Sequence, residues 1–447
     1  MIAGFLNTFK IHDLRKKILI TIGLIGVYRI GAFIPTPGIN GQALSEFFKS
    51  LANTPGGTLF GMINMFSGGA MRRLTIFALG IMPYISASII LQVLTPIVPA
   101  LERIAHQDNG RQKINQYTRY FTVIITMFQA FFISLWLENP QYFQGYQIVF
   151  NPGWGFRFTA VITLVTGTMF IVWLGEQITE FGIGNGISLI ITAGIISRIP
   201  AALIQLYALV DPFSPAGGQI QPFTLVIMAL MLVLVVVAVV LITQGQRKIP
   251  VQYARRVIGR RVYGGQSTYI PLRVNQAGVI PIIFAQSVLM FPATIGGFIQ
   301  NEAVRKIVSI FSSTNVVYYI LYGGLIIFFS YFYTALVFNP KDVAENMKKH
   351  GGFIPGVRPG SNTSEHLDHI MTRIILPGAV FLAIIAVMPS IVSATLHIPF
   401  LVASFFGGTG LLIIVGVLLD TERQLESQLL MRQYEGFMKK GRIRGRR

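Results

Sequence analysis

Apolar segments long enough to cross a bilayer recur along this chain of 447 residues. A spanning helix needs about 20 predominantly apolar residues, because it rises ~1.5 Å per residue through a hydrocarbon core of ~30 Å. Within lipid the backbone polar groups must be satisfied inside the protein, which helices achieve within one segment. The composition agrees, since 53% of the residues are hydrophobic and 12% are charged. The sequence therefore predicts an all-α multi-span membrane protein.

We predict ten spans, two of which contain residues that interrupt a helix. Arg198 and Pro200 lie in the fifth span, and Pro281 and Pro292 lie in the seventh. Neighbouring helices can satisfy the backbone groups that a proline frees. The predicted spans cover residues 18–34, 74–96, 118–137, 157–175, 187–208, 221–242, 275–299, 316–338, 372–391 and 400–419.

Basic residues orient these spans, because Lys and Arg are enriched in short cytoplasmic loops. With the N-terminus in the cytoplasm, all but eight of the 36 Lys and Arg residues fall in cytoplasmic segments. The inner loop 176–186 is an exception, since it contains Glu176 and Glu180 and neither Lys nor Arg. The overall balance places both termini in the cytoplasm.

The net charge of +19 is therefore concentrated on one face, which would attract anionic lipids, acidic proteins or ribosomal RNA. Segment 245–273 holds seven basic residues and no acidic one. Its paired arginines alternate with tyrosines, which favours a protruding docking hairpin over charge that only sets topology. The arginines are Arg255, Arg256, Arg260 and Arg261.

A short apolar segment precedes the second predicted span. Residues 58–67 would rise only about 15 Å as a helix, half of the hydrocarbon thickness. Gly68 and Gly69 then form a flexible joint, and Arg72 and Arg73 resist burial in lipid. Such a half-length segment is expected in a protein-lined cavity, which indicates an occupied pore or vestibule. From these residues alone, a helix lying in the membrane interface remains an alternative.

The sequence offers little support for catalysis. It contains no His-Glu-x-x-His, Gly-x-Ser-x-Gly or P-loop motif. His366 and His369 could share a helix face, but they have no third metal ligand nearby in sequence. The spans also lack the buried carboxylates and lysines typical of ion-coupled transporters. We therefore expect a passive conduit with no catalytic residue, no metal site and no cofactor.

Several long strings then carry a resemblance to a known family. They have the order and spacing found in bacterial SecY, the channel subunit of the Sec translocon, and the resemblance runs from about residue 10 to 440. The strings are RIGAFIPTPGI, FSGGAMRRLTIFALGIMPYISASII, FGIGNGISLII, GRRVYGGQSTYIPLRVN, VNQAGVIPIIF, FIPGVRPG and SFFGGTGLLIIVGVLLD.

The resemblance implies two pseudo-symmetric, inverted halves of five helices each around a central hourglass pore. They cover residues 18–208, with a plug helix at 59–70, and residues 209–419, with cytoplasmic loops 243–273 and 339–371. Residues 1–17 and the basic tail 420–447 would lie in the cytoplasm. The protein would be a multi-pass protein of the bacterial cytoplasmic (inner) membrane.

The resemblance also implies the pore elements. A ring of isoleucines would seal around a moving chain and deny ions a hydrated path. The ring positions are Ile81, Ile85, Ile187, Ile191, Ile280 and Ile413. The plug positions are Leu59, Phe60, Met62, Ile63, Met65, Phe66, Ser67, Gly68 and Gly69. By pattern alone, the isoleucines would be packing or lipid-facing residues.

A lateral gate is expected between the second and seventh spans. Polar groups on the two helices could form weak hydrogen bonds across the seam, which an apolar signal helix could replace. They are Ser86, Ser88, Gln92, Asn275, Gln286 and Ser287, and ordinary helix packing is the alternative interpretation.

The implied function is translocation of unfolded secretory polypeptides across the membrane and sideways release of transmembrane segments. The implied partners are the small subunits SecE and SecG, the motor SecA, a translating ribosome, signal sequences and nascent chains, anionic lipids and an accessory complex of the SecDF type. Arg358, in a Gly/Pro-shaped loop, matches an arginine that the family uses for SecA function. A secondary transporter and a membrane scaffold or insertase without a pore remain the competing classes.

Overall fold

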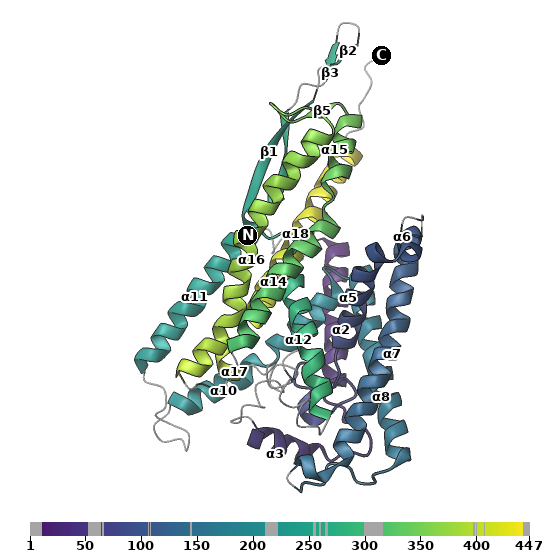
Figure 1. Cartoon of the computed structure of the whole chain (residues 1–447), viewed down its shortest axis with the longest axis vertical. Helices are drawn as coiled ribbons and strands as arrows, with labels where there is room; N and C mark the ends of the chain where they lie inside the picture. The colour runs from purple at the N-terminus through teal and green to yellow at the C-terminus, as the bar shows by residue number, and fades with distance from the viewer. Residues whose placement is uncertain are drawn as a thin grey trace.

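The computed structural model is mostly helical, and each predicted span falls on a helix or helix pair (Figure 1). It describes residues 11–51, 64, 67–105, 107, 109–143, 145–210, 222–253, 256–258, 261–263, 267–298, 316–396, 398, 400–405 and 407–440. The span helices are α2 (His12–Gly31), α5 (Met82–Ile97), α7 (Gly110–Glu138), α8 (Trp154–Phe181), α9 (Gly186–Ile196) with α10 (Ile199–Val210), α11 (Pro222–Gln244), α12 (Ile280–Phe298), α14 (Val316–Val337), α16 (Ser361–Leu396) and α18 (Thr409–Lys440). The predicted fold class is confirmed.

Shorter elements connect these helices. They are α3 (Gly41–Leu51), η1 (Met71–Arg73), α6 (Pro99–Ala105), η2 (Pro140–Phe143), α15 (Pro340–Lys349) and α17 (Phe400–Ala403). Within the described residues, six helices are long and apolar enough to cross a membrane, and a seventh arises if α5 and α6, bent by 101°, form one span.

The second predicted span begins later than the sequence indicated. Helix α5 starts at Met82, whereas residues 74–81 form turns. The carbonyl of Leu74 accepts from Thr36 N–H (3.0 Å), and Ile76 N–H donates to the Ile34 carbonyl (3.0 Å), so this backbone pairs with the chain leaving α2. Gly80, at φ +58°, then precedes the helix start. Irregular backbone is acceptable at membrane depth when protein buries it, as here.

Two other predicted boundaries were also wrong. The seventh span starts at Ile280 after a series of turns, and the tenth starts only at Thr409. Gly408, at φ +94°, separates α17 from α18, and a Cβ on it would collide with the Pro389 ring. Helix α18 then continues through the predicted basic tail as far as Lys440.

The segment between α11 and α12 forms a β-hairpin that projects beyond the helices (Figure 1). Strand β1 (Gln246–Tyr253) pairs antiparallel with β4 (Ser267–Arg273), with Gln246 opposite Arg273. Strands β2 (Arg256–Ile258) and β3 (Arg261–Tyr263) form a second antiparallel pair, in the segment between β1 and β4. Strand β5 (Gly352–Phe353) adds to the other edge of β1, which joins this hairpin to the loop between α14 and α16.

One apolar cluster lies between the two halves of the chain. It contains buried side chains from α2, α5, α8 and α9 on one side and from α11, α12, α14, α16 and α18 on the other. Helix α5 contacts α12, α9 contacts α18, and α10 contacts α17, so the halves meet at these three helix pairs among the described residues. Many large apolar side chains of α11, α8 and α14 instead point outward, as lipid-facing surfaces require.

Candidate functional site

The structure brings the predicted isoleucines together in the cluster between the halves. Four of them are almost fully buried, with exposed fractions of 2% for Ile81, 6% for Ile85, 1% for Ile191 and 0% for Ile413. The other two, Ile187 and Ile280, are partly buried and pack against the same cluster. These side chains come from α9, α12, α18 and from α5 with the residue before it, so each half contributes.

Close backbone packing fixes the α9 isoleucines. Asn185 caps α9, and its side-chain oxygen accepts from the N–H groups of Ile187 (3.1 Å) and Ser188 (3.2 Å). A Cβ on Gly175 of α8 would lie 3.0 Å from Cγ1 of Ile187, a tighter contact than usual, so the glycine helps α9 to approach α8 closely. Ile191 follows one turn later on the same face.

A comparable close approach joins α18 to the start of α12. A Cβ added to Gly416 would lie 2.6 Å from Cγ1 of Val279. Gly416 is one turn after Ile413, and Val279 directly precedes Ile280. This glycine therefore lets the two helices meet where their isoleucines lie.

The predicted plug is described only at its end. Leu59, Phe60, Met62, Ile63, Met65 and Phe66 lie outside the described residues. Ser67, Gly68 and Gly69 form a turn, with both glycines at positive φ. The Ser67 hydroxyl accepts from Met71 N–H at 3.2 Å, which ties the turn to η1.

Sequence reasoning missed where this turn rests. Arg29 of α2 donates to the Gly68 carbonyl at 3.2 Å, and its guanidinium lies 5.4 Å from the Phe33 ring centroid. A Cβ on Gly68 would lie 3.0 Å from both Cα of Gly194 and the Tyr28 hydroxyl. The one sequence feature that pointed to this contact was Gly194, a glycine inside the fifth predicted span. Its role could not be inferred from the sequence, because it packs against Gly68, which is far away along the chain.

Five of the predicted gate residues lie on α5 and α12, which contact each other, and the sixth, Asn275, lies in the turns just before α12. Two hydrogen bonds of this set run along their own helices: Gln92 donates to Ser88 (3.0 Å), and Ser287 donates to the Ile283 carbonyl (2.8 Å). Asn275 and Gln286 are 8% and 4% exposed, and Asn275 Nδ2 and Gln286 Oε1 have no partner among the described residues. Ser86 is half-buried.

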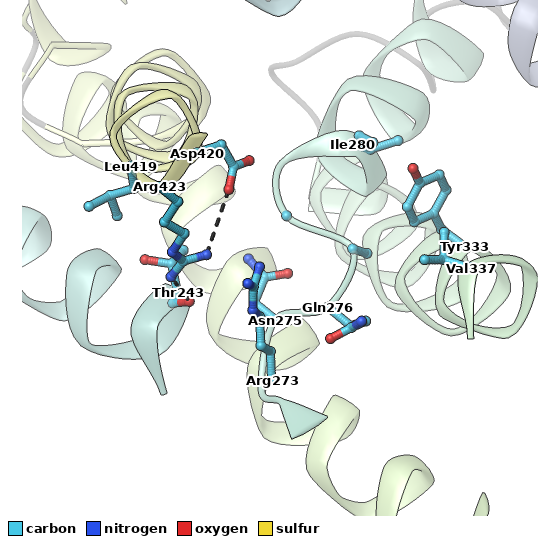
Figure 2. Close-up of a pocket in the computed structure, with 13 residues that line it drawn as sticks. Thr243, Arg273, Asn275, Gln276, Ile280, Tyr333, Val337, Leu419, Asp420 and Arg423 are labelled. Carbon is cyan, nitrogen blue, oxygen red and sulfur yellow. Dashed lines mark hydrogen bonds and ion pairs between the residues drawn. The ribbon is translucent and has the colours of Figure 1, made fainter. Parts of the chain in front are cut away.

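A polar cavity of about 210 Å³ lies at the start of α12 (Figure 2). It is lined by Thr243, Arg273, Asn275, Gln276, Ala277, Gly278, Ile280, Tyr333, Val337, Gly416, Leu419, Asp420 and Arg423. Arg423 donates to the Thr243 carbonyl (3.1 Å) and lies 3.7 Å from the Asp420 carboxylate.

The predicted docking residues belong to two segments, the one between α11 and α12 and the one between α14 and α16, which are joined where β1 pairs with β5. Arg256 and Arg261 belong to β2 and β3, and Arg255 and Arg260 lie outside the described residues. Arg358 is exposed in the loop after β5, and its carbonyl accepts from the Thr363 hydroxyl at 2.8 Å. Gly356 and Gly360, at φ +84° and +106°, shape this loop.

The comparisons with known proteins agree with this arrangement. The SecY family model matches residues 75–422. The chain belongs to the SecY family. It is 45% identical to the protein translocase subunit SecY of Aquifex aeolicus, over 97% of this chain and 98% of that protein. It is 46% identical to SecY of Escherichia coli K12, over 97% and 96% respectively.

Solved structures of SecY-like fold also match. One is described as "The structure of a protein conducting channel"; it has a TM-score of 0.56, 17% identity and 92% coverage of both chains. Another is Sec61 in the canine ribosome-channel complex, with a TM-score of 0.52, 16% identity and 92% coverage of both chains. The SecY fold is therefore shown.

Proposed function

We propose that this chain is the protein-conducting channel subunit of a Sec translocon. It would pass unfolded secretory polypeptides across the cytoplasmic membrane and release transmembrane segments sideways into it. The observation that carries this proposal is the meeting of isoleucines from both halves in one apolar cluster.

The cluster has the properties of a seal. Branched aliphatic side chains from separate helices can close around a peptide of any sequence and exclude hydrated ions when the path is empty. Ile81 and Ile85 from one half lie in one apolar cluster with Ile413 from the other, and no charged side chain is fully buried among the described residues. We infer that opening requires the two halves to separate at this level.

The seam between α5 and α12 is the proposed lateral gate. Asn275 Nδ2, just before α12, and Gln286 Oε1, on α12, have no hydrogen-bond partner among the described residues, so neither of these two atoms links α12 to α5. Interhelical hydrogen bonds in membranes contribute on average only ~0.6 kcal/mol, so replacing a few of them costs little. An apolar signal helix could therefore enter this seam.

Movement of a substrate needs an external motor or a translating ribosome, for which the hairpin and the Arg358 loop are the proposed docking surfaces. An arginine fork suits a bidentate contact with a carboxylate or phosphate. SecA, SecE, SecG, anionic lipids and an accessory complex of the SecDF type are the proposed partners. The matched Sec61 and Ssh1 structures were determined in ribosome complexes, which supports the ribosome as a partner.

Reconstitution tests the proposal against its alternatives. The chain, with SecE and SecG, is placed in proteoliposomes, and a secretory preprotein carrying a bulky tether at its C-terminus is added with SecA and ATP. A channel gives a trapped spanning intermediate and a substrate-dependent ion conductance. A scaffold without a pore gives no conductance, and a secondary transporter gives solute flux without preprotein; either result would overturn the proposal.

A further inference from the structure

The polar cavity at the start of α12 contains a buried hydrogen-bond donor with nothing to bind. Asn275 is 8% exposed, and its Nδ2 has no partner among the described residues. In Figure 2 this side chain lies among the cavity-lining residues, between Arg273 and the Asp420–Arg423 pair. A buried donor without a partner loses its hydrogen bond to water and gains none in the protein, so an acceptor placed here would be favoured.

The charges around Asn275 favour an anionic acceptor. Arg273 and Arg423 contribute two positive charges and Asp420 one negative charge, and Asp420 is already opposed by Arg423 at 3.7 Å. The cavity also contains Ala277 and Gly278, directly before α12, whose N-terminal end carries a partial positive charge. The local field is therefore positive.

The size of the cavity limits the ligand. At about 210 Å³ it has room for several waters and lies below the ~300–1,000 Å³ of drug-sized pockets. A tetrahedral oxyanion with a short substituent meets this limit and presents several acceptor atoms to the donors. Arginine pairs are well suited to phosphate oxygens.

We propose that this cavity binds one phosphoryl group, held by Arg273, Asn275 and Arg423. The group could belong to a phospholipid headgroup or to a soluble phosphate, which have the same recognition chemistry. The bound phosphoryl group would connect Arg423 on α18 with Asn275, which lies just before α12. The proposal goes beyond the channel function, because it concerns binding at one cavity and not the passage of a substrate.

The experiment measures phosphate binding to the full chain, purified with its small subunits. In one arm, the complex is held in a phosphate-free maltoside detergent, stripped of lipid, and dialysed against radiolabelled inorganic phosphate at fixed ionic strength. In the other, nanodiscs containing phosphatidylglycerol are analysed by native mass spectrometry for retained lipid. Variants are Asn275→Asp, which replaces the donor by a carboxylate of similar size, and Arg423→Gln. Arg373→Gln, an exposed arginine of α16 away from the cavity, is the matched control.

We expect about one bound phosphoryl group per chain, with affinity or retention reduced at least tenfold by both cavity variants and unchanged by the control. Variant-sensitive binding in the dialysis arm identifies a soluble phosphate, and variant-sensitive retention only in the lipid arm identifies a headgroup. Binding that is absent in both arms, or that falls equally in Arg373→Gln, would overturn the proposal. Circular dichroism and gel filtration show which variants fold. If Asn275→Asp does not fold, the binding measured for Arg423→Gln alone decides the outcome.

Discussion

Gly68 and Gly194 lie in backbone contact: a Cβ on Gly68 would be 3.0 Å from Cα of Gly194. This contact joins the end of the proposed plug segment to the last turn of α9, the helix that contributes two of the proposed ring isoleucines. The turn at Gly68 and the isoleucine cluster are thus parts of one packed unit. Displacing the turn should disturb the seal.

Gly194→Leu should therefore loosen the seal. The larger side chain would overlap Gly68 and the Tyr28 hydroxyl, and overpacking of this kind typically costs ~1–3 kcal/mol. We expect a higher basal conductance in planar bilayers with the protein still inserted. Gly23→Ala on α2, where an added Cβ meets nothing within 4 Å, is the control and should not leak. Equal conductance of both variants and the wild type would refute the idea that the Gly68–Gly194 contact supports the seal.

Replacing Ile85 and Ile191 by glycine should open a path for ions. Both side chains are buried in the cluster, so truncation removes seal contacts and leaves a cavity, at a cost on the order of 2–5 kcal/mol per site. Single-channel recording should show leakage, and substrates with weak signal sequences should be accepted. Ile162→Gly, on the exposed surface of α8, keeps the helix penalty of ~1 kcal/mol but should not leak.

Single cysteines should report the predicted orientation, because the chain has no native cysteine. Tyr146→Cys, on the loop between α7 and α8, should react with a membrane-impermeant thiol reagent added outside intact cells. Ser361→Cys, at the start of α16, should react only after the membrane is opened. Both positions are exposed in the structure, so access depends on the side of the membrane. Outside labelling of Ser361→Cys would overturn the ten-span topology.

Arg358→Glu should abolish or sharply reduce export driven by SecA and ATP. The side chain is exposed and its loop is held by a hydrogen bond from Thr363, so the fold should tolerate the change. Arg358→Lys should rescue export only in part, since it keeps the charge and loses the planar fork. Export rates of a model preprotein into inverted vesicles measure the effect. A wild-type rate for Arg358→Glu would remove the motor-docking role from this loop.

Two ion pairs between α7 and α8 should differ in their contribution to stability. Arg157 Nη2 and Glu138 Oε2 are 2.6 Å apart, and the side chains of Glu138 and Arg157 are 9% and 26% exposed. Glu138 also accepts a hydrogen bond from the Gly153 N–H. Arg119 and Glu176 lie 2.8 Å apart but are 48% and 30% exposed. We expect Glu138→Gln to lower the free energy of unfolding by about 1–3 kcal/mol, and Arg119→Gln by less than ~1 kcal/mol. Thermal unfolding in detergent compares them, and equal shifts would contradict the burial argument.

The positions of the spans were largely predictable, because apolar length is a local property of the sequence. The start of α5 was not, since hydrogen bonds to the chain after α2 hold residues 74–81 out of the helix. The break before α18 likewise depends on Gly408 packing against the Pro389 ring, a contact that no local pattern encodes. Local periodicity cannot anticipate such pairings.

The candidate site could also be predicted only in part from the sequence. The spacing of Ile81 and Ile85, and of Ile187 and Ile191, predicted that each pair shares one helix face. That the pairs from α5 and α9 would pack in one cluster with Ile413 of α18 depends on helix contacts between the halves. The seat of Gly68 and the cavity beside Asn275 had no signal strong enough to find them in the sequence.

The sequence by itself determined that the chain enters a membrane, and it predicted which segments cross the membrane and which face carries the positive charge. These properties follow from the apolar length of single segments and from the charge of single loops, so they need no partner helix. Only the tertiary structure decided that the isoleucines of both halves meet, that Gly68 packs against Gly194, and that Asn275 Nδ2 has no partner among the described residues. Those properties depend on close packing between segments far apart in sequence, which glycines such as Gly175 and Gly416 allow and which no single segment can specify.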